Sequence, residues 1–215
     1  SIRIQQGEYA NAIGHLLKIE SAAISKSSIA NAQVALMSSY YAITEYGMAR
    51  EYADKVIADA NAEADNRSLA YLYRARIKMT EQEFDSALAD FKEVAKGGGD
   101  GAAESAYNHA FVEYKRGDYV QAEKSIFKTI EKFSSFEKWK LESFLLLAEV
   151  YMKKPDWVQC RKTLDNIITK VKDPAVVERA RQLKLQLEEL GRKSVEELRD
   201  LKKTPIIVVL ENIRS

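Results

Sequence analysis

The sequence predicts an all-α fold, an α-α superhelix (solenoid) of antiparallel helix hairpins. The main observation is a phrase of one aromatic, one small and one apolar residue at positions i, i+3 and i+7, which occurs five times. The copies are Tyr9, Ala12 and Leu16; Tyr46, Ala49 and Ala53; Phe84, Ala87 and Phe91; Tyr119, Ala122 and Ile126; and Trp157, Cys160 and Leu164. The small residues are 37, 38, 35 and 38 positions apart. A period of this length with helical apolar spacing is typical of stacked helical hairpins.

A second regularity lies upstream of the aromatic residue. The pairs 13 residues apart are Gln33 and Tyr46, Tyr71 and Phe84, Ala106 and Tyr119, and Phe144 and Trp157. The segment between the two members of a pair has apolar residues three and four apart, as in an amphipathic helix. The pattern therefore predicts two helices in each repeat. The repeats differ in length in the connection between one hairpin and the next.

The small residue marks the contact between the two helices of a hairpin. Helix axes approach to about 8–10 Å, and the closest point accepts only a small side chain. The turns are also encoded locally. Gly117 supplies a positive φ and Asp118 can cap the following helix, whereas Pro155 ends a helix and Asp156 can cap the next one.

The predicted helices span 8–24, 29–44, 48–61, 67–80, 84–95, 102–115, 119–133, 139–153, 157–171 and 174–190. Asp173 followed by Pro174 favours a helix start, and Gly191 favours a stop. Ser194 with Glu197 forms a capping box, which predicts a further short helix at 194–203. The predicted organisation is a partial first repeat (1–28), full repeats (29–173), C-terminal capping helices (174–203) and an apolar tail (204–215).

Composition excludes several classes of protein. Hydrophobic residues make up 46% of the 215 residues and charged residues 30%, which is enough apolar surface to fold and no case for disorder. Lys and Arg number 33 against 32 Asp and Glu, which argues against nucleic-acid partners, including single-stranded RNA. One cysteine excludes an internal disulfide, and no apolar run is long enough to span a bilayer.

The repeats resemble the tetratricopeptide repeat family, whose phrase is a large residue, a Leu-small pair, a Tyr, a Gly-Asp-Tyr turn, and then Ala. The third full repeat carries Tyr107, Asn108, Ala110, Tyr114, Gly117, Asp118, Tyr119 and Ala122, and the fourth carries Phe144, Leu147, Ala148, Tyr151, Asp156, Trp157 and Leu164. The resemblance covers residues 7–190 and departs from the phrase where Arg74 replaces Leu and Lys78 replaces Tyr. It implies a right-handed superhelix and a role in protein binding.

Within that family, Lys132 to Ser135 followed by Leu146 to Tyr151 is similar to bacterial cell-envelope members. This resemblance implies scaffold work in the periplasm or at the outer membrane. The chain starts at Ser1 without an initiator Met and leads directly into a repeat, which favours a fragment or a processed chain, so a missing signal peptide is uninformative.

No pattern predicts catalysis, a metal site or a cofactor. The stretch 96–101 follows a helix rather than a strand, so we interpret it as a flexible junction and not as a phosphate cradle. Residues 59–65 alternate acidic and polar side chains like a calcium loop, but Ala64 and Ala70 occupy the places of its Gly and Glu. His15 and His109 are expected to pack against neighbouring helices, and Cys160 to be buried as a small apolar residue.

The predicted partner-binding groove lies on the concave face formed by the first helices of the hairpins. Its members are Tyr41, Arg76, Tyr107, Phe111, Tyr114, Glu149 and Met152. Tyr107, Phe111 and Tyr114 form a stripe at i, i+4 and i+7, and two interpretations of it stay open: packing within the repeat, or a surface for an extended or helical peptide. Changing Phe111 to Ala separates them, since a core residue would be needed for folding.

The sequence therefore predicts a protein-interaction scaffold that is not an enzyme and binds a protein or peptide partner on its concave face. The alternative is a structural spacer that self-associates within a larger envelope protein, for which an oligomer filling its own groove would be the sign. The apolar run Ile206 to Leu210 in the tail is expected to pack against the end of the solenoid or against a neighbouring molecule.

Overall fold

The computed structural model describes residues 2–22 and 25–202, with side chains over 7–22 and 25–193. These residues form ten helices and no strand, which confirms the all-α prediction. The helices are α1 (Ile2–Ser21), α2 (Lys26–Ala42), α3 (Tyr46–Ala58), α4 (Ala64–Thr80), α5 (Phe84–Ala95), α6 (Gly99–Lys115), α7 (Tyr119–Lys132), α8 (Glu137–Lys153), α9 (Trp157–Lys170) and α10 (Pro174–Lys202). The predicted tail 204–215 lies outside the described residues.

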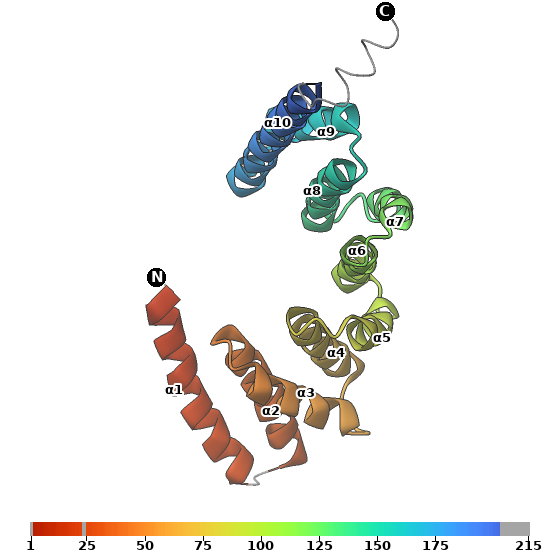
Figure 1. Cartoon of the computed structure of the whole chain (residues 1–215). Coiled ribbons are helices and arrows are strands. Elements are labelled where there is room, and N and C mark those ends of the chain that lie inside the picture. Colours follow the sequence, from red (N-terminus) through yellow and green to blue (C-terminus); the bar gives the residue numbers. More distant parts are fainter. Residues whose placement is uncertain (1, 23–24, 203–215) are drawn as a thin grey trace, which may run out of the picture. The chain divides into compact units, whose positions relative to one another are not determined.

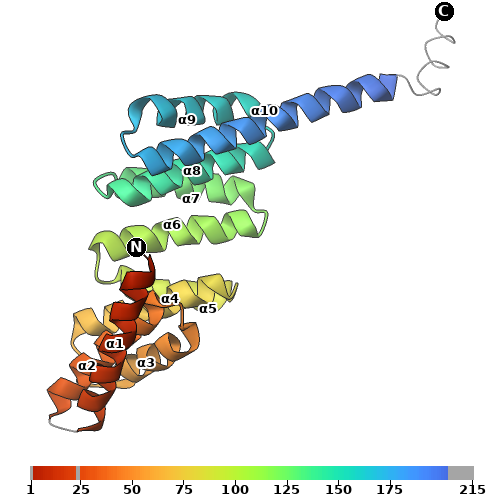
Figure 2. The same ribbon diagram turned by 90° about the vertical axis from the view of Figure 1, so that its left-hand side faces the viewer.

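The chain divides into two compact units, Ser1–Val112 and Glu113–Ser215. In unit one, consecutive helices from α1 to α5 pack against one another, and α2 also contacts α4. In unit two, α8 packs against α7 and α9, and α10 contacts both α9 and α8 (Figures 1 and 2). Within each unit, the first helices of successive hairpins therefore lie side by side as one layer.

The small residues occupy the positions that the repeat predicts. Ala49, Ala87, Ala122 and Cys160 have no exposed surface, whereas Ala12 is half-buried. The aromatic residue at the start of the second helix packs back across the turn, since the ring of Tyr46 lies 5.6 Å from that of Tyr41. In this hairpin α3 is thus held to α2 at the turn, and its small residue Ala49, one turn later, is fully buried.

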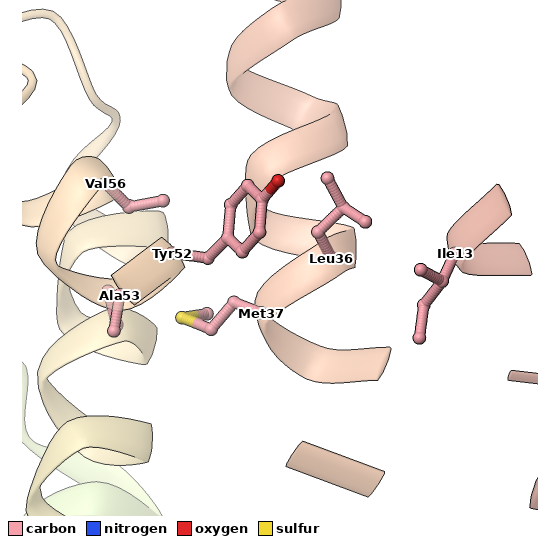
Figure 3. Close-up of a cluster of buried hydrophobic side chains, with 7 residues drawn as sticks. Ile13, Leu36, Met37, Tyr52, Ala53 and Val56 are labelled. Atoms are coloured by element: carbon pink, nitrogen blue, oxygen red, sulfur yellow. The ribbon is translucent and has the colours of Figure 1, made fainter. Parts of the chain in front are cut away.

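The core of unit one shows how a hairpin buries its apolar face. Leu36 and Met37 of α2 are fully buried and meet Ala53 and Val56 of α3, with Ile13 of α1 on the other side of α2 (Figure 3). Burying one such large side chain contributes about 1.5–3 kcal/mol. These contacts join α2 to α1 and α3, and the same cluster includes Ala70 of α4.

The hairpin turns keep one backbone geometry although their residues differ. The residue two positions before the aromatic is left-handed in three turns, with φ of 64° at Thr44, 63° at Gln82 and 81° at Gly117. In each turn the next amide donates to a carbonyl five residues back, from Glu45 to Tyr40, Glu83 to Lys78 and Asp118 to Glu113. Two of the three turns therefore place a residue with a Cβ where glycine is favoured.

The predicted caps of the last two hairpins are confirmed. The Asp118 carboxylate accepts a hydrogen bond from the amide of Gln121 at 3.3 Å, and the Asp156 carboxylate accepts one from the amide of Gln159 at 3.1 Å. Each bond satisfies one of the amides that the first turn of a helix leaves unpaired.

The predicted stop at Gly191 and the separate helix 194–203 are wrong, because α10 continues without a break to Lys202. Glycine inside a helix costs about 1 kcal/mol, which its neighbours can offset. The ion pair between Lys193 and Glu189, at 2.8 Å, spans Gly191 across one helical turn and supports the helical conformation there.

The glycine-rich stretch forms a tight connection between α5 and α6. Gly98 and Gly99 have φ values of 72° and 60°, and a Cβ at Gly101 would lie 2.7 Å from Cγ1 of Val94. Glycine is therefore required here both for backbone conformation and for close helix approach. That the junction lets the array bend stays a prediction.

The departures from the family phrase at Arg74 and Lys78 are explained by a buried acid. Asp90 of α5 is 4% exposed and accepts hydrogen bonds from Arg74 Nε at 2.8 Å, Arg74 Nη2 at 2.7 Å and Lys78 Nζ at 2.7 Å. Burial by itself would raise the pKa of Asp90, but the hydrogen bonds from Arg74 and Lys78 prevail and hold it below its usual value.

Replacing Gln82 by Gly should stabilise the protein by about 0.5 kcal/mol. Glycine relieves the left-handed conformation, although it also increases the entropy of the unfolded chain. Urea unfolding measures the change, and Gln82→Ala is the control because it removes the polar side chain but keeps the Cβ. Equal stability of the two variants would show that the turn carries no strain.

Replacing Asp90 by Asn should lower the free energy of unfolding by about 3–5 kcal/mol, because the buried Lys78 and the half-buried Arg74, which also pairs with Asp54, lose their shared acid. The wild-type contribution is present above the unfolded pKa of about 3.9 and is lost as the pH falls through the lower folded pKa. Joint replacement of Arg74, Lys78 and Asp90 by Leu should recover most of the loss. A triple variant as unstable as Asp90→Asn would contradict this account.

Candidate functional site

A cluster of polar aromatic and charged side chains crosses the first-helix layer of unit one. The Tyr41 ring of α2 meets the Tyr73 ring of α4 edge-on, with centroids 4.7 Å apart and an interplanar angle of 61°. The guanidinium carbon of Arg76 lies 5.8 Å from the centre of the Tyr73 ring. We call Tyr41, Tyr73, Arg76 and Glu104 the Tyr–Arg cluster.

The ion pair between Arg76 and Glu104 fixes this cluster. Arg76 Nε donates to Glu104 Oε1 at 2.7 Å and Nη2 donates to Oε2 at 2.6 Å. The Glu104 side chain is 3% exposed and that of Arg76 is 30% exposed. The buried carboxylate therefore accepts its hydrogen bonds from a guanidinium that is partly exposed to solvent. A bidentate pair of this kind restricts the guanidinium to one orientation.

The surroundings of Arg76 and Tyr41 keep these two side chains in their ordinary protonation states. The hydrogen bond to Glu104 raises the pKa of Arg76 against the effect of burial. Burial raises the pKa of Tyr41, and the nearby Arg76 charge opposes this only in part. Tyr41 is therefore a neutral phenol near pH 7 and can donate or accept a hydrogen bond.

Helix α6 extends the same surface. Glu104, Tyr107 and Phe111 lie at i, i+3 and i+7, which places them on one helix face. The Tyr107 and Phe111 rings stack with centroids 6.2 Å apart and an interplanar angle of 25°, and both residues are half-buried. The structure thus leaves both interpretations of the aromatic stripe open, because a half-buried ring can pack and still present an edge.

The other predicted groove residues form a separate group in unit two. Tyr114 is hydrogen-bonded to Glu149, and its ring lies 5.9 Å from that of Tyr119. Burial and then the Glu149 carboxylate raise the pKa of Tyr114 to about 12. Met152 is half-buried on α8, one turn beyond Glu149. A single groove through both groups stays a prediction.

The seven predicted residues thus fall into two local groups. Tyr41, Arg76, Tyr107 and Phe111 belong to unit one, and the other three belong to unit two. The sequence missed Tyr73 and Glu104, which complete the Tyr–Arg cluster. Tyr73 and Arg76 are three residues apart, and so are Glu104 and Tyr107. This helical spacing was the signal available in the sequence, but it does not show which residues of other helices each side chain contacts.

The remaining candidates for chemistry are accounted for by local structure. Asp59 accepts a hydrogen bond from the Asn61 amide at 2.9 Å, and Arg67 Nη2 donates to the carbonyls of Asp59, Ala60 and Ala62. A guanidinium thus sits where a calcium ion would need carbonyl oxygens. Across the described residues, no group of three His, Cys, Asp or Glu could hold a metal ion.

His15 and His109 are both exposed, and their packing against neighbouring helices stays a prediction. The sequence pattern by itself could not distinguish an exposed position from a contact face. Cys160 behaves as predicted: it is fully buried, and its Sγ donates to the Ala148 carbonyl at 3.3 Å.

Comparison with models of protein families and with curated proteins gives no match to this sequence. The tetratricopeptide resemblance therefore stays a prediction from the residues themselves. In the part of the chain that the structure describes, no helix is both long enough and apolar enough to cross a bilayer.

Cys160 should react very slowly with iodoacetamide at pH 8 in the folded protein. Burial raises the pKa of its thiol to about 11, so little thiolate forms and access is blocked. The raised pKa favours folding below the unfolded value near 8.5, and this contribution is lost as the pH rises to about 11. Mass spectrometry follows alkylation, with urea-unfolded protein as the control. Equal rates in both states would contradict burial.

Proposed function

We propose that this chain is a protein-interaction module of the tetratricopeptide type. In this proposal, the first helices of unit one bind an extended or helical segment of a partner protein, and the Tyr–Arg cluster is the anchor. Tyr107 and Phe111 on α6 supply further aromatic surface.

Unused hydrogen-bonding groups in the cluster support this proposal. Within the described side chains, no hydrogen bond uses the hydroxyls of Tyr41 and Tyr73 or the Nη1 atom of Arg76, and none of these atoms is fully buried. All three can donate to a carbonyl or carboxylate of a partner segment. Since the aromatic contacts and the Glu104 pair already restrict the side chains, binding would cost little further side-chain entropy.

The residue types also favour binding over chemistry. Tyrosine and arginine dominate the binding energy of many protein interfaces, particularly where they are partly buried before the partner arrives. Arg76 is neutralised by Glu104, so the surface does not select for strongly acidic partners. A segment that combines apolar side chains with exposed backbone carbonyls fits it best.

Selection from a phage-displayed library of random peptides tests the proposal. Peptides enriched on the wild-type protein should bind Tyr73→Ala about 30-fold more weakly, equivalent to about 2 kcal/mol for an aromatic anchor. Fluorescence anisotropy measures the affinity. Tyr9→Ala is the matched control, because Tyr9 is a 41% exposed tyrosine of unit one outside the cluster.

Circular dichroism of each variant separates lost binding from lost folding, and Phe111→Ala extends the test to α6. If the enriched peptides bind Tyr73→Ala and wild type equally, the Tyr–Arg cluster is not the anchor. Size-exclusion chromatography addresses the spacer alternative, since an oligomer that no enriched peptide disrupts would favour self-association.

A further inference from the structure

The second helices of unit two repeat a short pattern that the groove does not use. Residues 119–124 are Tyr-Val-Gln-Ala-Glu-Lys, and residues 157–162, 38 positions later, are Trp-Val-Gln-Cys-Arg-Lys. The small residue of each segment, Ala122 or Cys160, is fully buried. Val120 with Val158, and Lys124 with Lys162, therefore occupy equivalent positions on the outer sides of α7 and α9.

Four large apolar side chains are exposed on these two helices. The exposed fractions are 57% for Val120, 49% for Phe127, 37% for Trp157 and 76% for Val158. Single exposed apolar residues need no explanation, but a group on two helices that both pack against α8 suggests a contact surface.

The same two helices carry cations without acidic partners. Lys124 and Lys128 on α7, and Arg161 and Lys162 on α9, are exposed and form no ion pair within the described part of the chain. Glu123 of α7 pairs with Lys154 and Asp165 of α9 pairs with Lys184, whereas Glu131 of α7 is exposed and forms no ion pair within the described part of the chain. We call these four cations and four apolar residues the outer patch.

The part of the outer patch on α9 contains a hollow. This hollow of about 620 Å³ runs along α9, lined by Trp157, Val158, Arg161, Lys162, Asp165, Asn166 and Thr169. Among the residues whose side chains the structure describes, the lining of this hollow comes from α9. Of the four exposed apolar side chains, Trp157 and Val158 line this hollow, and Val120 and Phe127 are exposed on α7.

We propose that the outer patch docks unit two onto an anionic lipid surface. Aromatic and aliphatic side chains would enter the headgroup boundary, and the unpaired cations would meet lipid phosphates. Trp and Phe flanked by Lys and Arg are typical of interfacial binding, where apolar burial and attraction to anionic lipids act together. The patch shares no residue with the Tyr–Arg cluster, so a result that contradicts one of the two proposals leaves the other unaffected.

Tryptophan fluorescence reports on this contact directly. The chain has two tryptophans, and Trp139 is 6% exposed, so Trp139→Phe leaves Trp157 as the single reporter within the patch. With vesicles of equal parts phosphatidylglycerol and phosphatidylcholine at low salt, the Trp157 emission should shift to shorter wavelength. Vesicles of phosphatidylcholine alone should give no shift, and added salt should reverse the effect.

Charge reversal tests the cations against a control variant that makes the same change in net charge. Lys124→Glu with Lys162→Glu should weaken sedimentation with the anionic vesicles at least about tenfold, since each cation near such a surface matters individually. Lys153→Glu with Lys172→Glu is the matched control, because it makes the same charge change at exposed sites of unit two outside the patch. Phe127→Ser against Leu185→Ser compares apolar residues of similar exposure in the same way.

Two results would overturn the proposal. One is an unshifted Trp157 emission with anionic vesicles, which would leave an acidic protein surface as the occupant. The other is equal weakening by the patch variants and by their controls, which would reduce the effect to net charge. Circular dichroism must show that each variant keeps its helical content.

Discussion

The close approach of two helices at one small residue is the constraint on which the rest of this structure depends. Ala49, Ala87, Ala122 and Cys160 are all fully buried at that point, and a larger side chain would push the helices of a hairpin apart. Because each hairpin has this fixed geometry, its first helix presents a defined face to the next one. The register of Tyr41 against Tyr73 follows from it, since both rings project from neighbouring first helices.

Two arginines on α4 show how this geometry divides structural from surface roles. Arg74 points into its own hairpin and, with Lys78, neutralises the buried Asp90 of α5. Arg76, two residues later, points to the next first helix and pairs with Glu104. A buried ion cluster adds little net stability compared with apolar packing, but breaking it is costly, so it specifies which helices pair. At Arg76, the ion pair with Glu104 orients a guanidinium that remains partly exposed to solvent.

The first and second helices of the repeats differ in what they expose. First helices of unit one carry neutral phenols and an arginine whose charge is balanced, which suits hydrogen bonding to a protein segment. Second helices of unit two carry unpaired cations beside projecting apolar side chains, which suits an extended anionic surface. The residues of the Tyr–Arg cluster and those of the outer patch lie on different helices, so the chemistry of one can change while the residues of the other stay the same.

The sequence by itself determined the helices, the hairpin contacts and the caps, because each depends on spacing within about one helical turn or on one turn residue. It also identified Tyr41 and Arg76 as surface candidates from their positions in the repeat. Only the tertiary structure decided that Tyr73 and Glu104 complete their cluster, that both histidines are exposed and that α10 continues through Gly191. The physical reason is that local spacing does not encode which residues of other helices a side chain contacts. It also does not show whether an ion pair such as that between Lys193 and Glu189 offsets the cost of Gly191 inside a helix.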